Sequence, residues 1–262
     1  MCGIVGYTGK QSVAKQILDA LELLEYRGYD SAGMAIVDET NGQVQIRKRA
    51  GRVADLEKAW KANPVNGICG IGHTRWATHG GVSDVNAHPH RAGRITLVHN
   101  GIIENYEELK DHFGLADELI SDTDSEVVAA VLNRFYTGDP HEALFQTVKC
   151  LKGTFALVVI FDDIPDVIFA IRNVSPIVAA YREDGTMLAS DVAALGGQAT
   201  SYMVVPEYHV VELHTDDIRV YNMKNELCEA EFLDIDWDTT RAGKGNYPFY
   251  MEKEIMEQPE AI

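Results

Sequence analysis

Cys2 is the first residue whose type and position together suggest chemistry. It follows an initiator methionine, which is normally removed when the next side chain is small, so the processed chain would begin with a thiol and a free α-amine on one residue. An unperturbed α-amine has a pKa of about 7.7 to 8.0 and can accept the proton of the thiol near neutral pH. A frayed terminal cysteine is the alternative. The apolar, glycine-spaced segment 3–7 favours a buried strand that would fix this terminus.

The run from His73 to Gly81 (HTRWATHGG) is a second concentration of reactive side chains. The planar fork of Arg75 suits a carboxylate, and Thr78 and His79 add hydrogen-bonding groups. Its two glycines allow the chain to bend over a ligand. We predict a loop that closes over a bound molecule, although an ordinary surface loop has the same composition.

Two further positions could serve a polar reaction. Asn100 and Gly101 follow a predicted strand at 95–98, and they offer a side-chain amide and an open backbone N–H, a pair that can stabilise an oxyanion. Asn-Gly is also the commonest two-residue hairpin turn. Asp124, just inside a predicted helix, could bind an α-ammonium group or simply complement the helix dipole.

Metal and cofactor chemistry are not expected. Five histidines lie between residues 73 and 99, but their spacing matches no compact set of metal ligands, and we interpret most of them as structural or surface groups. The four cysteines include no CxxC pair. We interpret Cys69, Cys150 and Cys228 as buried thiols.

Composition limits the classes of partner. A chain of 262 residues with 46% hydrophobic content can bury a large core, and its formal net charge of -17 disfavours nucleic acid. The densest basic stretch, at 47–49, resembles a solvated strand edge. No apolar run approaches the roughly 20 residues that cross a bilayer, and no signal peptide is recognisable, so no membrane partner and a cytoplasmic location are expected.

The elements that must position these residues can be read from apolar periodicity and capping signals. A helix is predicted from Ser12, with Gly28 placed to stop it, and three more from Asn105, Thr123 and Asp139, each followed three residues later by a glutamate. Short β-branched runs predict strands at 34–37, 95–98, 155–161, 167–171, 177–181 and 209–213. Consecutive strands favour antiparallel pairing and an α+β fold with helices layered on sheets. A polar segment at 236–247 is predicted to be a linker.

Several segments, in this order, resemble the class II glutamine amidotransferases, the N-terminal-cysteine branch of the Ntn hydrolases. They are MCGIVGYTG, LEYRGYDSAG, GHTRWATHG, VNAHPH, VHNGIIENY and SDTDSEV. These motifs are similar to those in the glutaminase half of the glucosamine-6-phosphate synthases (glutamine:fructose-6-phosphate aminotransferases, isomerizing). The resemblance spans residues 2 to about 240, and its strength comes from several long motifs that agree in order and spacing.

The resemblance implies roles for individual residues. Cys2 would form a γ-glutamyl thioester while its own amine shuttles protons, and Asn100 and Gly101 would form the oxyanion hole. Arg75 would hold the α-carboxylate of glutamine and Asp124 its α-ammonium group.

It implies three residues of a mobile loop, Trp76, Thr78 and His79, with the tryptophan also gating an ammonia channel. Arg27 would lie close to the nucleophile and help to shape the site.

The resemblance also implies a fold, a domain division and partners. The fold would be a four-layer α/β/β/α sandwich of two mainly antiparallel sheets. Residues 1–239 would form the amidotransferase domain, and residues 240–262 a linker and the start of a junction to an absent sugar-phosphate isomerase domain. The full-length enzyme would be a homodimer. The alternatives are an N-terminal-cysteine amidase or acylase acting on another amide, and a non-catalytic domain that senses glutamine.

Overall fold

Two antiparallel sheets form the centre of the molecule. The structure is a computed structural model, and it describes residues 2–236, 247 and 250–261. Within these residues the first sheet has eight strands in the order β15-β11-β9-β10-β1-β4-β2-β3, and the second has seven in the order β14-β13-β12-β8-β7-β6-β5. The first sheet comprises β1 Gly3–Gly9, β2 Ser31–Val37, β3 Val44–Ala50, β4 Cys69–Arg75, β9 Val178–Arg182, β10 Gly185–Ala189, β11 Ser201–Val204 and β15 Leu233–Asp234. The second comprises β5 His90–Ala92, β6 Ile95–Ile103, β7 Gly153–Phe161, β8 Ile164–Asn173, β12 Val210–His214, β13 Asp217–Tyr221 and β14 Leu227–Cys228.

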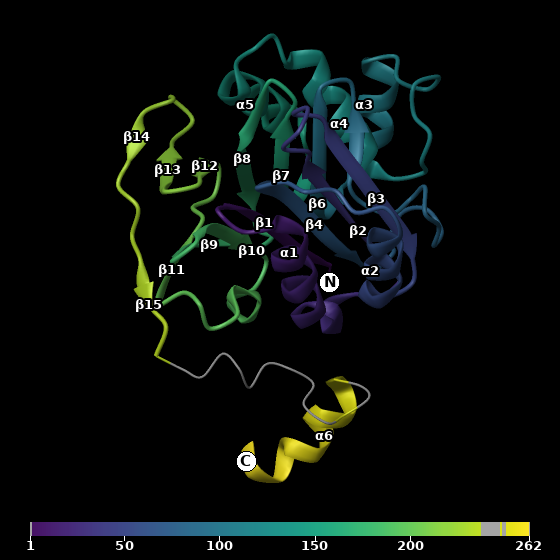
Figure 1. Cartoon of the computed structure of the whole chain (residues 1–262). Helices are drawn as coiled ribbons and strands as arrows, with labels where there is room; N and C mark the ends of the chain where they lie inside the picture. Colours follow the sequence, from purple (N-terminus) through teal and green to yellow (C-terminus); the bar gives the residue numbers. More distant parts are fainter. Residues whose placement is uncertain (1, 237–246, 248–249, 262) are drawn as a thin grey trace.

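Helices cover the outer faces of both sheets (Figure 1). Helices α1 (Val13–Leu23) and α2 (Val53–Ala62) pack on the first sheet, and α3 (Tyr106–His112), α4 (Asp124–Phe135) and α5 (Pro140–Cys150) pack on the second. Two short 3₁₀ helices, η1 (Glu25–Arg27) and η2 (Val192–Leu195), and the helix α6 (Tyr250–Ala261) complete the described elements.

Three apolar cores separate the layers. Because successive side chains of a strand point to opposite faces, Ile4 of β1 joins the core between the sheets while Val5 and Tyr7 join the core beneath α1 and α2. The third core lies between the second sheet and α3, α4 and α5. These cores confirm the predicted α+β fold with an α/β/β/α order of layers.

The predicted helices are present, but their ends depend on contacts that the sequence did not reveal. Thr123 and Asp139 cap α4 and α5 through side chains that accept from the N–H groups of Glu126 and Glu142, as predicted. Ser12 and Asn105 occupy the N-cap positions of α1 and α3 without a side-chain cap. The amide of Asn105 instead donates to the Cys150 carbonyl oxygen and accepts from the Lys152 N–H.

Gly28 does not end the first helix, contrary to the prediction. Helix α1 ends at Leu23, and η1 follows before Gly28 is reached. The capping N–H of Leu24 bonds back to carbonyl groups of α1, including that of Ala20, so the helix closes on its own backbone before the glycine. An ideal Cβ at Gly28 would approach the carbonyl carbon of Arg75 to 2.7 Å, so this glycine permits a close approach of two chain segments.

All six predicted strands are confirmed, and most extend beyond the predicted ranges. The basic stretch at 47–49 lies in β3 at the edge of the first sheet, as its solvated character indicated. Helix α2 was not predicted, although Val53, Leu56 and Trp60 are buried at helical spacing.

The predictions for the cysteines were only partly correct. Cys69 is buried as predicted, whereas Cys150 and Cys228 are only partly buried, so the prediction of three buried thiols was wrong for two. The proposed linker at 236–247 and the domain boundary at 239/240 fall almost entirely outside the described residues. Among the described helices, none combines the length and the apolar character required to traverse a bilayer.

Candidate active site

The N-terminal segment is fixed inside the fold. Cys2 directly precedes β1, which lies between β10 and β4 in the first sheet. The Cys2 carbonyl oxygen accepts from Arg27 Nε and from Asn100 Nδ2, each at 3.0 Å. Ile4 and Ser190 exchange two further hydrogen bonds of 3.0 Å, from the Ile4 N–H to Ser190 Oγ and from the Ser190 N–H to the Ile4 carbonyl oxygen. Residue 2 is therefore held by both sheets.

The Cys2 thiol lies against the backbone of Trp76. The Trp76 N–H donates to Sγ at 3.2 Å, and Sγ lies 3.5 Å from the Trp76 carbonyl oxygen. Burial raises the pKa of the Cys2 thiol, while the Trp76 hydrogen bond and the charges of Arg75 and Arg27 act in the opposite direction. Because burial is the larger effect, this sulfur needs a base to become a thiolate at neutral pH.

Arg27 lies next to Cys2, and its proposed role in shaping the site stays a prediction. It lies in η1 and is buried, and besides its bond to the Cys2 carbonyl its Nη1 atom pairs with Asp191 at 3.3 Å. Tyr26 donates to the same Asp191 oxygen at 2.7 Å. These contacts hold the guanidinium beside the backbone of residue 2.

Asn100 and Gly101 lie within a strand and not in a turn. The predicted strand at 95–98 continues to Ile103 as β6, and Gly101 pairs with Phe155 of β7, so the hairpin alternative was wrong. Gly101 has φ +133°, and an ideal Cβ there would lie 2.0 Å from the Thr154 carbonyl oxygen. Only glycine fits this position, because a side chain would meet both backbone strain and a steric clash.

Arg75 is the last residue of β4, so the run 73–81 divides into a strand end and a loop, whereas the whole run was predicted as a loop. The residue is 4% exposed, and its guanidinium donates to the carbonyl oxygens of His79, Gly80 and Gly81, the last two at 3.2 Å. The structure therefore shows Arg75 holding the loop 76–81. Its predicted contact with a substrate carboxylate stays a prediction.

The side chains of the loop 76–81 have different surroundings. Trp76 is 48% exposed and makes an edge contact with Tyr29 at 6.1 Å between ring centroids. Thr78 is exposed, and the His79 ring lies 5.3 Å from that of Tyr106 in α3.

Two side chains outside this loop tie it to the body of the domain. The Ala77 N–H donates to Asp30 Oδ2 at 2.9 Å. Asn86 Nδ2 donates to the Gly81 carbonyl oxygen at 3.0 Å and to Asp122 Oδ2 at 3.3 Å. Asn86 and Asp122 were missed by the sequence reasoning, which had only an unremarkable amide and carboxylate to judge from.

Asp124 is the first residue of α4, which confirms the predicted helix start, and it is buried. Its Oδ2 accepts from the Ile103 N–H at 2.9 Å, and Oδ1 accepts from Ser125 Oγ at 3.3 Å. Its negative charge acts on Arg75, as does that of Asp30. Each carboxylate oxygen has a second lone pair that can accept a hydrogen bond. The carboxylate therefore both joins α4 to β6 and remains able to accept from an ammonium group.

Four of the five clustered histidines are buried beside this site: His73, His88, His90 and His99. Burial lowers the pKa of His73 to about 3 and the pKa values of His88 and His90 well below the usual value. Their burial fits the interpretation of most of these histidines as structural or surface groups. No group of three His, Cys, Asp or Glu side chains is arranged to hold a metal ion in the part of the chain that the structure describes.

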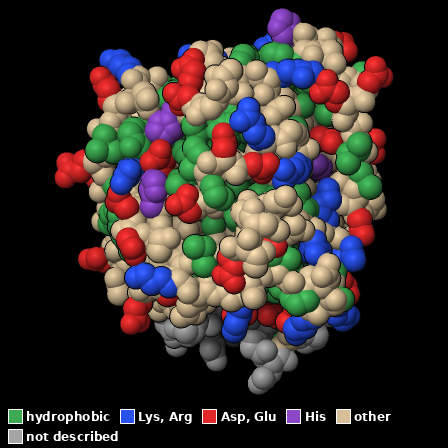
Figure 2. Space-filling view, turned by 45° about the horizontal axis from the view of Figure 1, so that its top comes forward, with side chains coloured by type: hydrophobic (Ala, Val, Ile, Leu, Met, Phe, Trp, Pro, Cys, Tyr) green, Lys and Arg blue, Asp and Glu red, His purple; other side chains and the backbone are tan. Residues whose placement is uncertain are grey.

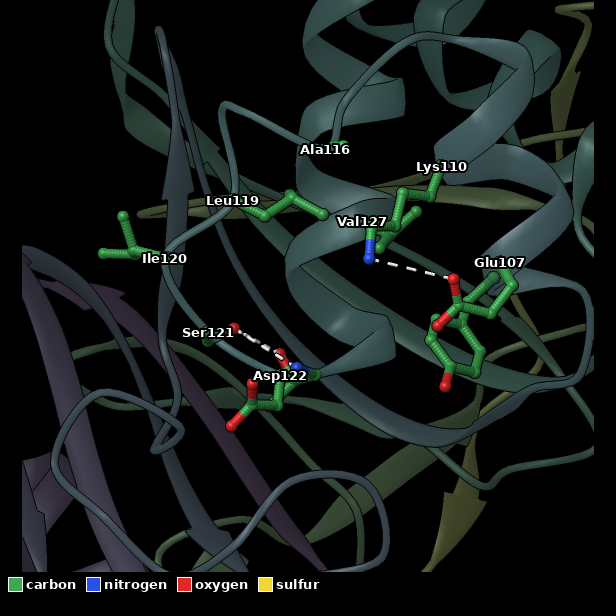
Figure 3. Close-up of a pocket in the computed structure, with 10 residues that line it drawn as sticks. Glu107, Lys110, Ala116, Leu119, Ile120, Ser121, Asp122 and Val127 are labelled. Carbon is green, nitrogen blue, oxygen red and sulfur yellow. Dashed lines mark hydrogen bonds and ion pairs between the residues drawn. The ribbon is translucent and has the colours of Figure 1, made fainter.

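A cavity of about 340 Å³ lies beside residues 119–123, the segment that leads into α4 (Figure 3). Figure 3 shows Glu107 and Lys110 of α3 paired across one side of it, with a 3.7 Å separation, and Ser121 and Asp122 on the other. Its lining residues include neither Cys2 nor Arg75 nor Asn100. The cavity therefore lies next to the segment that contains Asp122, and the Cys2 thiol does not line it.

One face of the molecule carries charges of both signs. Figure 2 shows acidic and basic side chains interspersed over most of one face, with hydrophobic side chains between them. In the site itself the charges are separated by sign. Arg27 and Arg75 lie near Cys2. Asp124 and Asp30 lie near Arg75.

A family model described as "Glutamine amidotransferase domain" matches residues 37–247. The curated relatives are named "Glutamine--fructose-6-phosphate aminotransferase [isomerizing]". The one from Clostridium acetobutylicum is 41% identical over 265 residues, which cover 100% of this chain and 43% of the relative. The one from Aquifex aeolicus is 42% identical over 265 residues, covering 100% of this chain and 44% of the relative. The chain thus spans less than half the length of these relatives.

Solved structures share the fold. The glutamine phosphoribosylpyrophosphate amidotransferase from B. subtilis, complexed with ADP and GMP, superposes with a TM-score of 0.73 at 20% identity, over 86% of this chain and 50% of that one. A glutamine aminotransferase class-II domain protein from Silicibacter pomeroyi superposes with a TM-score of 0.62 at 17% identity, over 85% of this chain and 99% of that one. At these identities the likeness supports the fold.

Proposed function

Because this chain belongs to the glutamine amidotransferase domain family, an enzyme family, we propose that it hydrolyses L-glutamine to L-glutamate and ammonia with Cys2 as the nucleophile. One observation carries the proposal. The residue that would become the N-terminus is held by Arg27 and Asn100, with its sulfur against the Trp76 amide. A terminal cysteine without a function would need no such fixation.

The first half of the reaction forms a thioester. Removal of Met1 frees the α-amine of Cys2, which takes the thiol proton as the sulfur attacks the side-chain amide carbon of glutamine. The negative charge that develops on the amide oxygen is stabilised by the Asn100 amide and the Gly101 N–H. The tetrahedral intermediate collapses, the C–N bond breaks, and the protonated amine returns its proton to the departing ammonia.

The second half releases glutamate. The free α-amine now accepts a proton from water as its oxygen attacks the thioester carbon, and the same two donors stabilise the second oxyanion. Breaking the C–S bond gives the γ-carboxyl group of glutamate and restores the thiol. No cofactor is required for either half.

Recognition of glutamine is assigned to groups at opposite ends of the amino acid. We assign the α-carboxylate to Arg75, with Thr78 and His79 from the loop, and the α-ammonium group to Asp124. Trp76 would close over the bound substrate with this loop. Arg75 is suited to both tasks because a guanidinium has five N–H donors, so bonds to loop carbonyls leave others for a carboxylate.

The acceptor of the ammonia follows from the relatives. Their printed name pairs glutamine with fructose 6-phosphate, so we propose that this domain supplies ammonia for conversion of fructose 6-phosphate to glucosamine 6-phosphate in a longer, homodimeric protein. The sugar-phosphate isomerase part would lie outside this chain. The step belongs to hexosamine biosynthesis in the cytoplasm, and the Trp76 ring would gate the passage of ammonia.

Two other functions make different demands on the same residues. An acylase acting on another amide has no need for both Arg75 and Asp124, since these match the two ends of an α-amino acid. A domain that only senses glutamine has no need for a fixed thiol at residue 2. The arrangement therefore favours hydrolysis of glutamine.

The experiment is ammonia release from glutamine by purified protein whose N-terminus has been sequenced. We expect activity in the processed protein and its loss in Cys2→Ala, which should keep its fold because the change at the terminus opens little space. The electrophilic glutamine mimic 6-diazo-5-oxo-L-norleucine should add one equivalent of mass at residue 2. Turnover by Cys2→Ala, or a label on another residue, would refute the nucleophile.

A further inference from the structure

His73 is fully buried beside Asn100, outside the groups that the proposed mechanism uses. It lies in β4 of the first sheet, and Asn100 lies in β6 of the second. Its Nε2 atom is 3.1 Å from the His99 carbonyl oxygen and 3.1 Å from Asn100 Oδ1. The contact therefore joins the two sheets directly behind the proposed oxyanion corner.

Two backbone carbonyl groups determine how these side chains are oriented. The Cys2 carbonyl oxygen can only accept, so the Asn100 atom 3.0 Å from it must be the amide nitrogen, and Oδ1 must face His73. The His99 carbonyl oxygen also can only accept. His73 Nε2 therefore carries a hydrogen, which it shares between this carbonyl and Asn100 Oδ1.

The surroundings of His73 keep it neutral in this form. Burial lowers its pKa to about 3, and its ring stacks on that of His88 at 4.1 Å between centroids and 11° between planes. The His88 Nδ1 atom accepts from the His99 N–H at 3.2 Å, which fixes the second ring of the stack. His73 Nδ1 has no hydrogen-bond partner, and a lone pair at that atom costs less than an unsatisfied N–H would.

We propose that His73 is a positioning residue for glutamine hydrolysis, whose Nε2–H holds Asn100 Oδ1 so that the amide hydrogens of Asn100 face Cys2 and the developing oxyanion. The inference rests on the proposed function. Without this donor the amide can rotate, and its carbonyl oxygen would then repel the negative charge that its nitrogen should stabilise. His73 acts through Asn100 and touches neither glutamine nor the sulfur.

The test compares two substitutions of nearly equal length. His73→Met removes the donor, whereas the side-chain amide of His73→Gln can place an N–H near the original Nε2 position. Loss of one oxyanion donor typically lowers kcat by about 10² to 10³. We expect His73→Met to lower kcat by about 10²-fold and to change KM by less than about threefold. His73→Gln should recover most of the lost kcat.

His141→Leu is the matched control for loss of a buried histidine. His141 belongs to α5 on the far side of the second sheet and bonds to Glu212 at 2.9 Å. We expect it to keep the wild-type kcat. Thermal unfolding of all variants separates a catalytic loss from a folding loss.

A measurement on the unsubstituted protein avoids the question of folding. Nitrogen chemical shifts of ¹⁵N-labelled imidazoles should show His73 protonated at Nε2 only, with no titration between pH 5 and 8. A proton at Nδ1, or a titration near pH 6.5, would overturn the inference. Equal kcat in wild type and His73→Met, or equal losses in the Met and Gln variants, would overturn it while leaving the hydrolysis intact. Absence of hydrolysis by the processed wild type would instead refute the proposed function, and the positioning role with it.

Discussion

At the scale of single residues, Arg75 shows how one side chain can serve a loop and a ligand together. Three carbonyl groups of the loop 76–81 accept from its guanidinium. A lysine would keep the charge but could not reproduce this fork, because an ammonium group is a compact point charge. Any substitution of Arg75 should therefore disturb the loop as well as substrate binding.

We predict that Arg75→Lys raises the KM for glutamine by about 10- to 100-fold, since a charge-assisted hydrogen bond contributes about 1.5 to 3 kcal/mol. Steady-state kinetics would measure this change. Hydrogen exchange should also become faster in the loop 76–81 of the free variant, because its carbonyl anchors are lost.

Arg134→Lys is a suitable comparison for Arg75→Lys. Arg134 lies in α4 and pairs with Glu118 on the surface, where its side chain is 41% exposed. Its replacement should leave both KM and loop exchange unchanged. An unaltered KM in Arg75→Lys would show that another group holds the carboxylate.

The residues of the site could be predicted from sequence to different degrees. Cys2 stands out because its position creates a base and a nucleophile together, and Asp124 because a helix start was recognisable. The pair Asn100 and Gly101 could not be assigned from local sequence, since a hairpin turn requires the same two residues. Asn86 and Asp122 gave no signal, because their role depends on contacts between distant segments.

At the scale of elements, strand β6 positions Asn100 and depends on Gly101. The backbone there has φ +133°, and the Thr154 carbonyl oxygen of β7 leaves no space for a Cβ. Gly114, after α3, also has a positive φ of +62°, but an ideal Cβ there meets no atom within 4 Å. A comparison of substitutions at these two positions therefore separates the cost of backbone strain from the cost of a steric clash.

We predict that Gly101→Ala lowers the free energy of unfolding by about 2 kcal/mol or more beyond the loss in Gly114→Ala. Both variants suffer the strain of a positive φ, of order 1–2 kcal/mol, and only Gly101→Ala adds overpacking, typically 1–3 kcal/mol. Urea denaturation would measure both losses. Equal stability of the two variants would contradict the close approach of β6 and β7.

The ends of elements were harder to predict than their existence. Thr123 and Asn105 each precede an acidic residue by three positions, yet only Thr123 caps its helix. The Asn105 amide bonds instead to the backbone at Cys150 and Lys152. A local signal cannot anticipate such competition, because the alternative partners lie more than forty residues away in sequence.

At the scale of the whole molecule, the layered fold explains why the site forms where it does. The Cys2 carbonyl lies at the start of the first sheet, and Asn100 reaches it from the second. Consecutive strands without an intervening helix indicated antiparallel sheets with helices layered on them, and the family resemblance supplied the number of layers. Periodicity alone could not, because it identifies buried faces without saying which faces pack together.

In the proposed longer protein, glutamine hydrolysis and sugar-phosphate chemistry occur in different parts of the chain. This separation leads to a prediction about the present chain alone. Every residue assigned to the site serves the amino acid or its amide, and none has a role for a sugar phosphate. The chain also spans only 43% and 44% of the lengths of the two aminotransferase relatives from Clostridium acetobutylicum and Aquifex aeolicus. We therefore expect it to release glutamate and ammonia in equal amounts, and to form no glucosamine 6-phosphate when fructose 6-phosphate is present.

Glutamine labelled with ¹⁵N at the side-chain amide gives a direct readout of this expectation. The label should appear in free ammonia, because no residue assigned to the site binds a sugar phosphate that could accept it. Cys2→Ala provides the blank for spontaneous hydrolysis. Mass spectrometry that found the label in an amino sugar phosphate would show that this chain holds an acceptor site of its own, and the assignment of the sugar chemistry to a separate part of the protein would then be wrong.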